Sequence, residues 1–172
     1  MTTDYVNKEE FYEELKQYYE DKHLKRVNDP KINDKIGKNI LLICNNLANR
    51  YNFVNYTSNW KDEMIAEGVI HCVKAVRTFN PNKSNNPFGF FTRVAFNAFV
   101  SVINKEKEET YVKHKNYRRL GINNEILDES NDISDTIIEE FEEKKRKQKE
   151  KQRQKKAEKA LNLEFIENDE QQ

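Results

Sequence analysis

Residues 86–109, NPFGFFTRVAFNAFVSVINKEKEE, constrain the fold most strongly, because they have the pattern of one long amphipathic helix. Asn86 is a favourable N-cap, and Pro87 occupies the first helical position, where its missing N–H costs nothing. Apolar residues recur at spacings of three and four and define one face: Phe91, Val94, Ala95, Ala98, Phe99, Val102 and Ile103. The sequence therefore predicts a helix that buries this face in a core.

The same stretch carries side chains beyond those that the apolar face needs. The surplus aromatics are Phe88, Phe90 and Phe96. From the pattern alone, core packing and surface exposure are equally good interpretations of these three rings. Polar and basic side chains mark much of the other face: Arg93, Asn97, Ser101, Asn104 and Lys105. Such a combination is suited to holding an unpaired nucleic-acid strand.

Three further segments with helical periodicity precede this stretch, at residues 7–26, 34–52 and 59–78. The chain has only four glycines and three prolines, which favours helices over turn-rich β structure. Its 172 residues suffice for one domain with a core, plus tails. The sequence thus predicts an all-α helical bundle.

The apolar pattern weakens after residue 109. Residues 120–135 contain an acidic run and are predicted to form a loop, whereas residues 139–161 are almost entirely charged. The charged segment fits either a solvated helix or a disordered linker. Calcium-loop spacing occurs at Asp128, Ser130, Asp132 and Glu139. However, Ile133 stands where such loops need glycine, so an acidic loop is the preferred interpretation.

The bulk composition restricts the class of protein. Thirty Lys and Arg balance thirty Asp and Glu, which argues against a protein that coats nucleic acid by charge alone. The composition is still compatible with a local basic surface, because positive and negative charges are segregated along the sequence. Cys44 and Cys72 sit in apolar helical patterns, which favours buried free thiols in a reducing compartment. No segment resembles a membrane span or a secretory signal, so a cytoplasmic protein is expected.

No arrangement of residues indicates an enzyme. His23, His71 and His114 are scattered and show no metal-ligand spacing with the cysteines. The chain has neither a glycine-rich phosphate loop nor a nucleophile elbow. We therefore expect a non-enzymatic protein without metal or cofactor.

Residues 63–79, EMIAEGVIHCVKAVRTF, resemble a helix in region two of bacterial sigma factors, which has an acidic start, a Glu–Gly pair and a closing Phe. Residues 88–100, FGFFTRVAFNAFV, are similar to the promoter-reading helix that follows, and residues 34–51 fit the helix that precedes. Through YTSNWKDEMIAEG at residues 56–68 and its hydrophobic, acidic C-terminus, the chain is similar to the late-gene sigma factors of T-even-type phages.

This resemblance implies a sigma region two-like helical bundle with an extended charged C-terminal helix or tail. The implied parts are an N-terminal helix at 1–30, a region two-like domain at 31–115, an acidic linker at 116–138 and a charged segment with a hydrophobic motif at 139–172. Full sigma factors also contain a helix-turn-helix that reads the minus-thirty-five element. No second globular pattern follows residue 109, so the chain is expected to read only the minus-ten element.

The resemblance also implies two binding surfaces. In the family, the first of these helices docks on the clamp helices of the largest RNA polymerase subunit, and the matching residues are Glu63, Glu67 and Val73. The next helix captures the non-template strand of the minus-ten element, and the matching residues are Phe88, Phe90, Arg93, Phe96, Asn97 and Lys105. Primary sigma factors carry a Trp pair where this chain has Val94 and Ala95, so its melting wedge is expected to differ.

The C-terminal hydrophobic motif matches the one with which the resembling phage proteins bind the phage sliding clamp: Leu161, Leu163, Phe165 and Ile166. The polymerase flap is an alternative target for it. The implied partners are host RNA polymerase core, late promoter DNA, the sliding clamp and a phage co-activator. The protein is expected to be monomeric when free, to bind no membrane and to work in the cytoplasm of the infected bacterial host.

Two other functions remain open at this point. An RNA polymerase-bound adaptor or co-activator would keep the sigma-like fold without sequence-specific DNA reading. A helical structural or nuclease-like phage protein would have no role in transcription at all.

Overall fold

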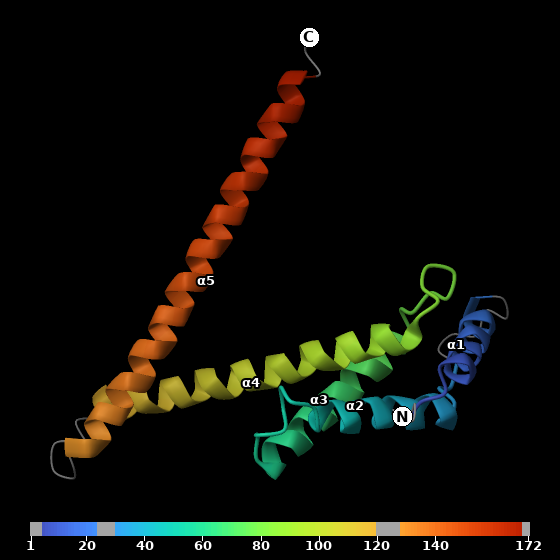
Figure 1. Cartoon of the computed structure of the whole chain (residues 1–172), viewed down its shortest axis with the longest axis horizontal. Coiled ribbons are helices and arrows are strands. Elements are labelled where there is room, and N and C mark those ends of the chain that lie inside the picture. Colours follow the sequence, from blue (N-terminus) through green and yellow to red (C-terminus); the bar gives the residue numbers. More distant parts are fainter. Residues whose placement is uncertain (1–4, 24–29, 120–127, 170–172) are drawn as a thin grey trace. The chain divides into compact units, whose positions relative to one another are not determined.

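The computed structural model describes residues 5–23, 30–119 and 128–169, and within them the side chains of all but 128–134 and 159–169. These ranges contain helices and no strand, so the all-α prediction is confirmed (Figure 1). The helices are α1 (Lys8–His23), α2 (Asp34–Ala48), α3 (Ser58–Val76), α4 (Pro87–Arg119) and α5 (Asp128–Asp169). The chain divides into two compact units, Met1–Lys105 and Glu106–Gln172, with the division inside α4.

The first unit is built around the apolar stripes that the sequence predicts. Ile36, Ile40 and Ile43 of α2 are fully buried, at spacings of four and three residues. The predicted stripe of α4 supplies Phe91, Ala95 and Phe99, none of which has any exposed surface. Helical periodicity identified these residues correctly, because side chains three and four residues apart share one face of a helix. The apolar pattern of residues 34–52 also includes Leu41, Leu42 and Tyr51, and for these three the prediction of burial is wrong, since they are exposed.

Gly68 sets how closely α3 approaches its neighbours. A Cβ atom at this position would lie 2.7 Å from Cε1 of Phe99 and 3.2 Å from Sγ of Cys44. Phe99 and Cys44 are both fully buried, so neither can move aside without disturbing the core. The absence of a side chain at residue 68 thus lets α2, α3 and α4 pack together.

Asparagine side chains begin three of the helices. The Asn86 side-chain oxygen accepts a hydrogen bond from the Gly89 N–H at 2.9 Å, which confirms the predicted cap of α4. Asn7 accepts from the N–H groups of Glu9 and Glu10, both at 3.2 Å. Asn33 accepts from the N–H of Lys35 at 3.3 Å at the start of α2.

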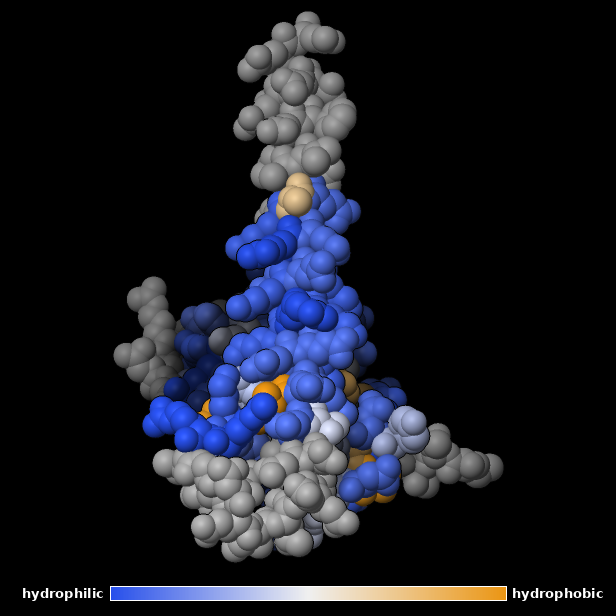
Figure 2. Space-filling model, turned by 90° about the vertical axis from the view of Figure 1, so that its left-hand side faces the viewer, coloured by the Kyte–Doolittle hydropathy of each residue, from blue (hydrophilic) through white to orange (hydrophobic). Residues whose placement is uncertain are grey.

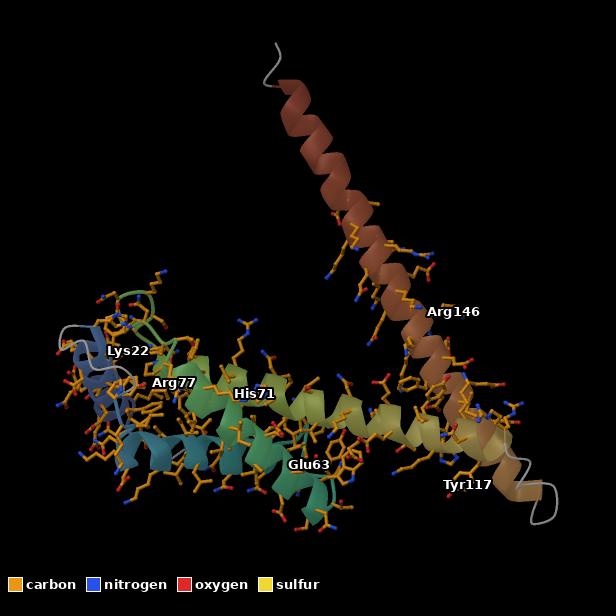
Figure 3. The ribbon with its side chains drawn as sticks, turned by 180° about the vertical axis from the view of Figure 1, so that it is seen from behind. Lys22, Glu63, His71, Arg77, Tyr117 and Arg146 are labelled. Atoms are coloured by element: carbon orange, nitrogen blue, oxygen red, sulfur yellow. The ribbon has the colours of Figure 1, made fainter. Side chains whose placement is uncertain are left out.

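Helix α1 packs into the first unit through apolar and polar contacts. Its fully buried Phe11 lies against Phe91, with ring centroids 5.5 Å apart. Lys22 Nζ donates to the backbone carbonyl of Arg77 at 2.7 Å (both residues are labelled in Figure 3). At the other end of α1, Glu10 pairs with Lys35 of α2 at 2.9 Å. The N-terminal helix is thereby tied to α2, to the end of α3 and to α4.

The second unit pairs the C-terminal part of α4 with α5. The rings of Tyr111 and Phe141 stack with centroids 4.5 Å apart and planes 19° apart. Tyr111 donates its hydroxyl hydrogen to Glu142 at 2.9 Å. Arg118 pairs with Asp135 at 3.1 Å. These contacts join residues that are 17 to 31 positions apart in the sequence.

The structure corrects two sequence predictions in this unit. Helix α4 continues to Arg119 instead of ending at residue 109, since residues 106–119 contain neither glycine nor proline and are rich in helix formers. The predicted acidic loop is also wrong over residues 128–135, because α5 begins at Asp128. Acidic side chains at a helix start interact favourably with the helix dipole. The charged segment after residue 139 is helical, and its described side chains are mostly exposed, so the solvated helix is the correct one of the two interpretations.

Candidate functional site

Helix α4 presents a polar face on the first unit that is exposed over several turns. Arg93, Phe96 and Asn97 share this face, because residues three and four apart are neighbours on a helix. Ser101 and Asn104 continue it toward the end of the unit, and both are exposed. A cation, an aromatic ring and an amide therefore occur together on one accessible surface.

The three surplus phenylalanines differ in their surroundings. Phe96 is the most accessible of them, with 37 % of its surface exposed. Its ring meets that of buried Phe53 edge-on, with centroids 5.5 Å apart. Phe53 in turn packs against Phe99 at 5.1 Å, which connects this contact to the core. Phe96 is thus an exposed ring on a rigid support.

Phe88 and Phe90 are half-buried and pack against the core. The Phe90 ring contacts the rings of Phe79 and Phe91, at centroid distances of 5.3 and 5.1 Å. The Phe88 ring meets that of Tyr5 at 5.8 Å, and Lys8 Nζ lies 5.6 Å above it. Contacts within the protein cover much of both rings, so each offers less exposed surface to DNA than Phe96 does. Their contacts with DNA stay a prediction.

Glu63 and Glu67 share one face of α3 with His71, at intervals of four residues (Glu63 and His71 are labelled in Figure 3). Glu67 Oε2 lies 3.7 Å from Nε2 of His71. This face forms one wall of a pocket of about 150 Å³, whose other wall belongs to α4. The α4 wall consists of Ala98, Ser101, Val102 and Lys105.

The pocket brings together residues that the resemblance assigns to different surfaces. Glu63 and Glu67 match polymerase-binding positions, whereas Lys105 matches a DNA-binding position. Sequence reasoning missed His71 and Ser101 as members of this group. The signal for His71 was available, because it follows Glu67 by four residues and therefore lies one turn along the same helix face.

Val73 does not join Glu63 and Glu67 on their face. It is half-buried and packs against the core of the first unit. At 3.6 residues per turn it lies about 120° around α3 from Glu67. Its assignment to the polymerase-binding surface stays a prediction. Polymerase would have to contact Val73 on a different side of α3 from Glu63 and Glu67.

Cys44 and Cys72 are both free and fully buried, as predicted. A hydrogen bond with Cys44, together with burial, raises the pKa of the Cys72 thiol. Cys72 Sγ also lies 3.5 Å from the backbone oxygen of Phe91. The hydrogen bond between the two thiols lowers the pKa of Cys44. Because both side chains are fully buried, neither thiol is accessible to a reaction partner, and the pair is part of the core.

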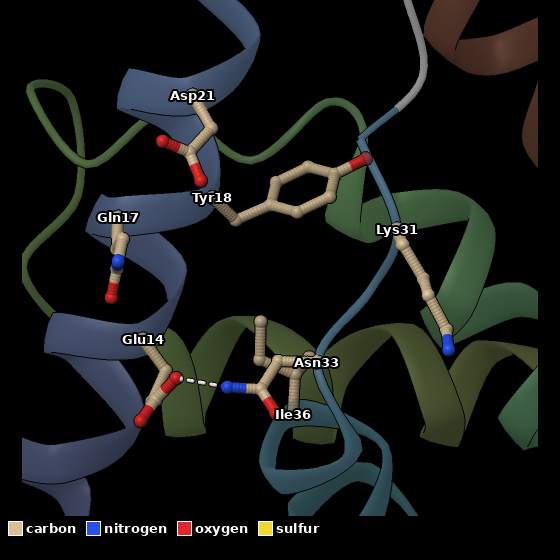
Figure 4. Close-up of a pocket in the computed structure, with 7 residues that line it drawn as sticks. All are labelled: Glu14, Gln17, Tyr18, Asp21, Lys31, Asn33 and Ile36. Carbon is tan, nitrogen blue, oxygen red and sulfur yellow. Dashed lines mark hydrogen bonds between the residues drawn. The ribbon is translucent and has the colours of Figure 1, made fainter. Parts of the chain in front are cut away.

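A second pocket, of about 120 Å³, lies between α1 and the start of α2 (Figure 4). Glu14 and Asn33 face one another across it, and the Asn33 amide donates to Glu14 at 2.6 Å. The remaining lining residues are Gln17, Tyr18, Asp21, Lys31 and Ile36. The Glu14–Asn33 bond belongs to the joint between the two helices, so this pocket carries no separate chemistry.

The described side chains do not form a metal-binding cluster. Among these residues, no three His, Cys, Asp or Glu side chains are grouped so that they could hold a metal ion. Within the described helices, none combines the length and apolarity that crossing a membrane requires.

The C-terminal hydrophobic motif falls in α5, which extends to Asp169. The side chains of Leu161, Leu163, Phe165 and Ile166 lie outside the described residues. The assignment of this motif to a sliding clamp or a polymerase flap therefore stays a prediction.

No protein-family model and no curated protein matches this chain.

Proposed function

We propose that the protein is a minimal phage-encoded sigma factor, which binds host RNA polymerase core and helps to open a TATA-like minus-ten element of late promoters. The observation that carries the proposal is the joint exposure of Arg93, Phe96 and Asn97 on one face of α4. The Glu63–Glu67 face of α3 meets the same helix across the pocket described above. The proposal also rests on the resemblance of these two segments to sigma region two.

The chemistry of the α4 face suits a melted DNA strand. An unpaired base needs an aromatic surface to replace its lost stacking, and the exposed part of Phe96 offers one. The Asn97 amide can donate to and accept from a base edge, while Arg93 can pair with a phosphate. A–T-rich DNA costs least to open, which is why a TATA-like element is the proposed target.

The chemistry of the α3 face suits a basic protein partner. The Glu67 side chain is 45 % exposed, and Glu63 one turn earlier is exposed as well. Carboxylates in this setting form charge-assisted hydrogen bonds with arginine side chains. We assign this face to the clamp helices of the largest polymerase subunit.

The C-terminal motif completes the proposal. A short hydrophobic segment that binds the sliding clamp, or the polymerase flap, would raise the effective concentration of the protein at late promoters. Such linkage would add to the affinity that the minus-ten contact supplies. The corresponding location is the cytoplasm of the infected bacterial host, and a phage co-activator is a further proposed partner.

Reconstitution with host core polymerase and a late promoter tests the proposal. Potassium permanganate detects unpaired thymines in the minus-ten element, and a pull-down measures polymerase binding separately. Replacing Arg93, Phe96 and Asn97 by Ala should reduce strand opening roughly tenfold or more with polymerase binding intact. Replacing Glu63 and Glu67 by Ala should weaken polymerase binding itself. Lys38→Ala and Glu20→Ala are controls, since both side chains are exposed on other helices.

A polymerase-bound adaptor without DNA reading is the second candidate. The observation in its favour is that Phe88 and Phe90 are engaged within the protein, which reduces the aromatic surface available to bases. The adaptor is supported if the α4 triple variant leaves promoter opening unchanged while the Glu63/Glu67 variant loses polymerase binding. Failure of the wild-type protein to bind polymerase at all would instead support a phage protein outside transcription.

A further inference from the structure

Charge is distributed very unevenly between α5 and the rest of the chain. Residues 144–156, which we call the basic arm, contain nine Lys or Arg and a single acidic residue, Glu150. The arm therefore carries a formal charge of +8, and the remaining residues together carry −8. The zero net charge of the protein conceals this separation. A block of like charge on this scale is typical of segments that contact an oppositely charged partner.

The basic arm is available for such a partner. Every residue from 144 to 156 is exposed, and the described length of α5 is almost entirely hydrophilic (Figure 2). Lys145 pairs with Glu108 at 3.7 Å, and Lys147 pairs with Glu143 at 2.7 Å. Within the described part of the chain, seven basic side chains of the arm make no ion pair or hydrogen bond: Lys144, Arg146, Lys149, Lys151, Arg153, Lys155 and Lys156.

The basic side chains form two stripes along the helix. At 3.6 residues per turn, the first stripe contains Lys144, Lys147, Lys151 and Lys155. The second contains Lys145, Arg146, Lys149, Arg153 and Lys156. Gln148 and Gln152 lie between the stripes on one side, and Glu150 and Gln154 lie between them on the other. The arm thus presents positive charge in two directions, with three glutamines and Glu150 between them.

This geometry discriminates among polyanionic partners. A membrane attracts a helix that is basic on one face and apolar on the other, and the arm has no apolar face. The major groove of duplex DNA admits an α-helix and places a phosphate backbone on each side of it. The major groove of duplex RNA is too narrow for a helix. The two stripes therefore fit duplex DNA better than RNA or a lipid surface.

We propose that the basic arm is a sequence-independent binding element for duplex DNA, which lies in the major groove and contacts the phosphates of both strands. Its thirteen residues span about 20 Å, along which duplex DNA presents on the order of ten phosphates. The arm holds the protein on duplex DNA before any strand is opened. This binding needs neither polymerase nor a promoter, so it stands apart from the proposed sigma function.

Fluorescence anisotropy of the full chain with a labelled 30-base-pair duplex that lacks any TATA-like element measures this binding. Between 50 and 200 mM salt, log K should fall against log[salt] with a slope of about −4 to −6, as expected for four to seven phosphate contacts. The arm variant K149Q/K151Q/R153Q/K155Q/K156Q should bind at least ~30-fold more weakly at 100 mM salt, with a shallower slope. Gln is nearly as good a helix former as Lys, and circular dichroism checks that α5 persists.

A matched control removes the same charge elsewhere. The side chains changed in K31Q/K38Q/R50Q/K74Q/K83Q are exposed and scattered over the first unit. This control should stay within about threefold of the wild type, because its charges are not clustered. The assay contains neither polymerase nor a TATA-like element, which separates this test from that of the proposed function. Equal loss in the arm variant and the control, or tighter binding of duplex RNA or of phosphatidylserine vesicles than of DNA, would overturn the proposal.

Discussion

Gly68 of α3 lies so close to Phe99 of α4 that a methyl group at residue 68 would come within 2.7 Å of the aromatic ring. Phe99 is fully buried, and it also supports Phe53, the ring on which Phe96 rests. The absence of a side chain at Gly68 of α3 therefore allows the packing that supports the exposed ring of Phe96 on α4. Stability and the candidate DNA-binding face are linked through this contact.

Replacing Gly68 by Ala should destabilise the protein, because the core must move to admit a methyl group. We expect a loss of about 1–3 kcal/mol in the free energy of unfolding, measured by urea denaturation. Gly37→Ala is the matched control, since Gly37 lies in α2 and no atom would come within 4 Å of its new Cβ. The control should be neutral or stabilising by up to ~1 kcal/mol, as alanine favours helix. Equal effects of the two substitutions would contradict the packing described here.

Phe96 and Phe91 should respond differently to truncation. Phe91 is fully buried, so Phe91→Ala should cost about 3–5 kcal/mol. Phe96 keeps 37 % of its surface exposed, so Phe96→Ala should cost less than about 1.5 kcal/mol. Thermal unfolding of the two variants measures the difference. A Phe96 variant as unstable as the Phe91 variant would mean that Phe96 belongs to the core.

The pairing of α4 with α5 in the second unit should weaken in acid. The pKa of the Glu142 carboxyl lies below its ordinary value of 4.5, because the Tyr111 hydroxyl and Lys115 Nζ donate to it at 2.9 and 3.4 Å. Because the pKa is lowered, ionised Glu142 stabilises the pairing of α4 with α5 fully above pH 4.5, the ordinary pKa. This stabilisation is lost as the pH falls through the lowered pKa. A fluorotyrosine at residue 111, followed by ¹⁹F NMR from pH 6 to pH 3, should report this transition.

Glu142→Gln should remove that pH response, since an amide does not titrate in this range. Glu140→Gln is the control, because Glu140 is exposed and does not belong to this hydrogen-bonded group. The control should keep the wild-type response. A transition that survives in Glu142→Gln would assign it to another carboxyl group.

Cys44 and Cys72 should be unreactive in the folded protein. Both thiols are fully buried, so a reagent cannot reach either of them while the core is closed. Their hydrogen bond and burial raise the pKa of Cys72, whereas the same bond lowers the pKa of Cys44, so burial protects Cys44. The thiolate is the reactive form, so modification with a disulfide reagent at pH 8 should be at least ~100-fold slower than in guanidinium chloride. Rapid modification of either thiol under native conditions would show that the core opens readily around it.

The sequence was sufficient to predict much of the core of the first unit. Ile36, Ile40 and Phe91 are buried where their helical spacing places them, because amphipathic periodicity is a local property. The extension of α4 to Arg119 and the early start of α5 were not predicted. The apolar pattern weakens after residue 109, and contacts such as Tyr111 with Phe141 join residues thirty positions apart and leave no periodic signal.

The candidate site was predictable only in part. Helical spacing placed Arg93 and Asn97 on an exposed face, and it placed Glu63 one turn from Glu67. The surroundings of the surplus rings depend on distant residues: Phe90 packs on Phe79, and Phe88 packs on Tyr5. No pattern within residues 86–109 contains that information, which is why the three rings had equal standing in the sequence.

The most direct test of the proposed sigma function compares strand opening by the wild type and by the R93A/F96A/N97A variant, each with host core polymerase on a late promoter. Permanganate reactivity of thymines in the minus-ten element is the measurement, at protein concentrations that saturate polymerase binding for both. The proposal predicts strong reactivity with the wild type and roughly tenfold or greater loss with the variant. Equal reactivity with both proteins, or none with the wild type despite tight polymerase binding, would contradict it.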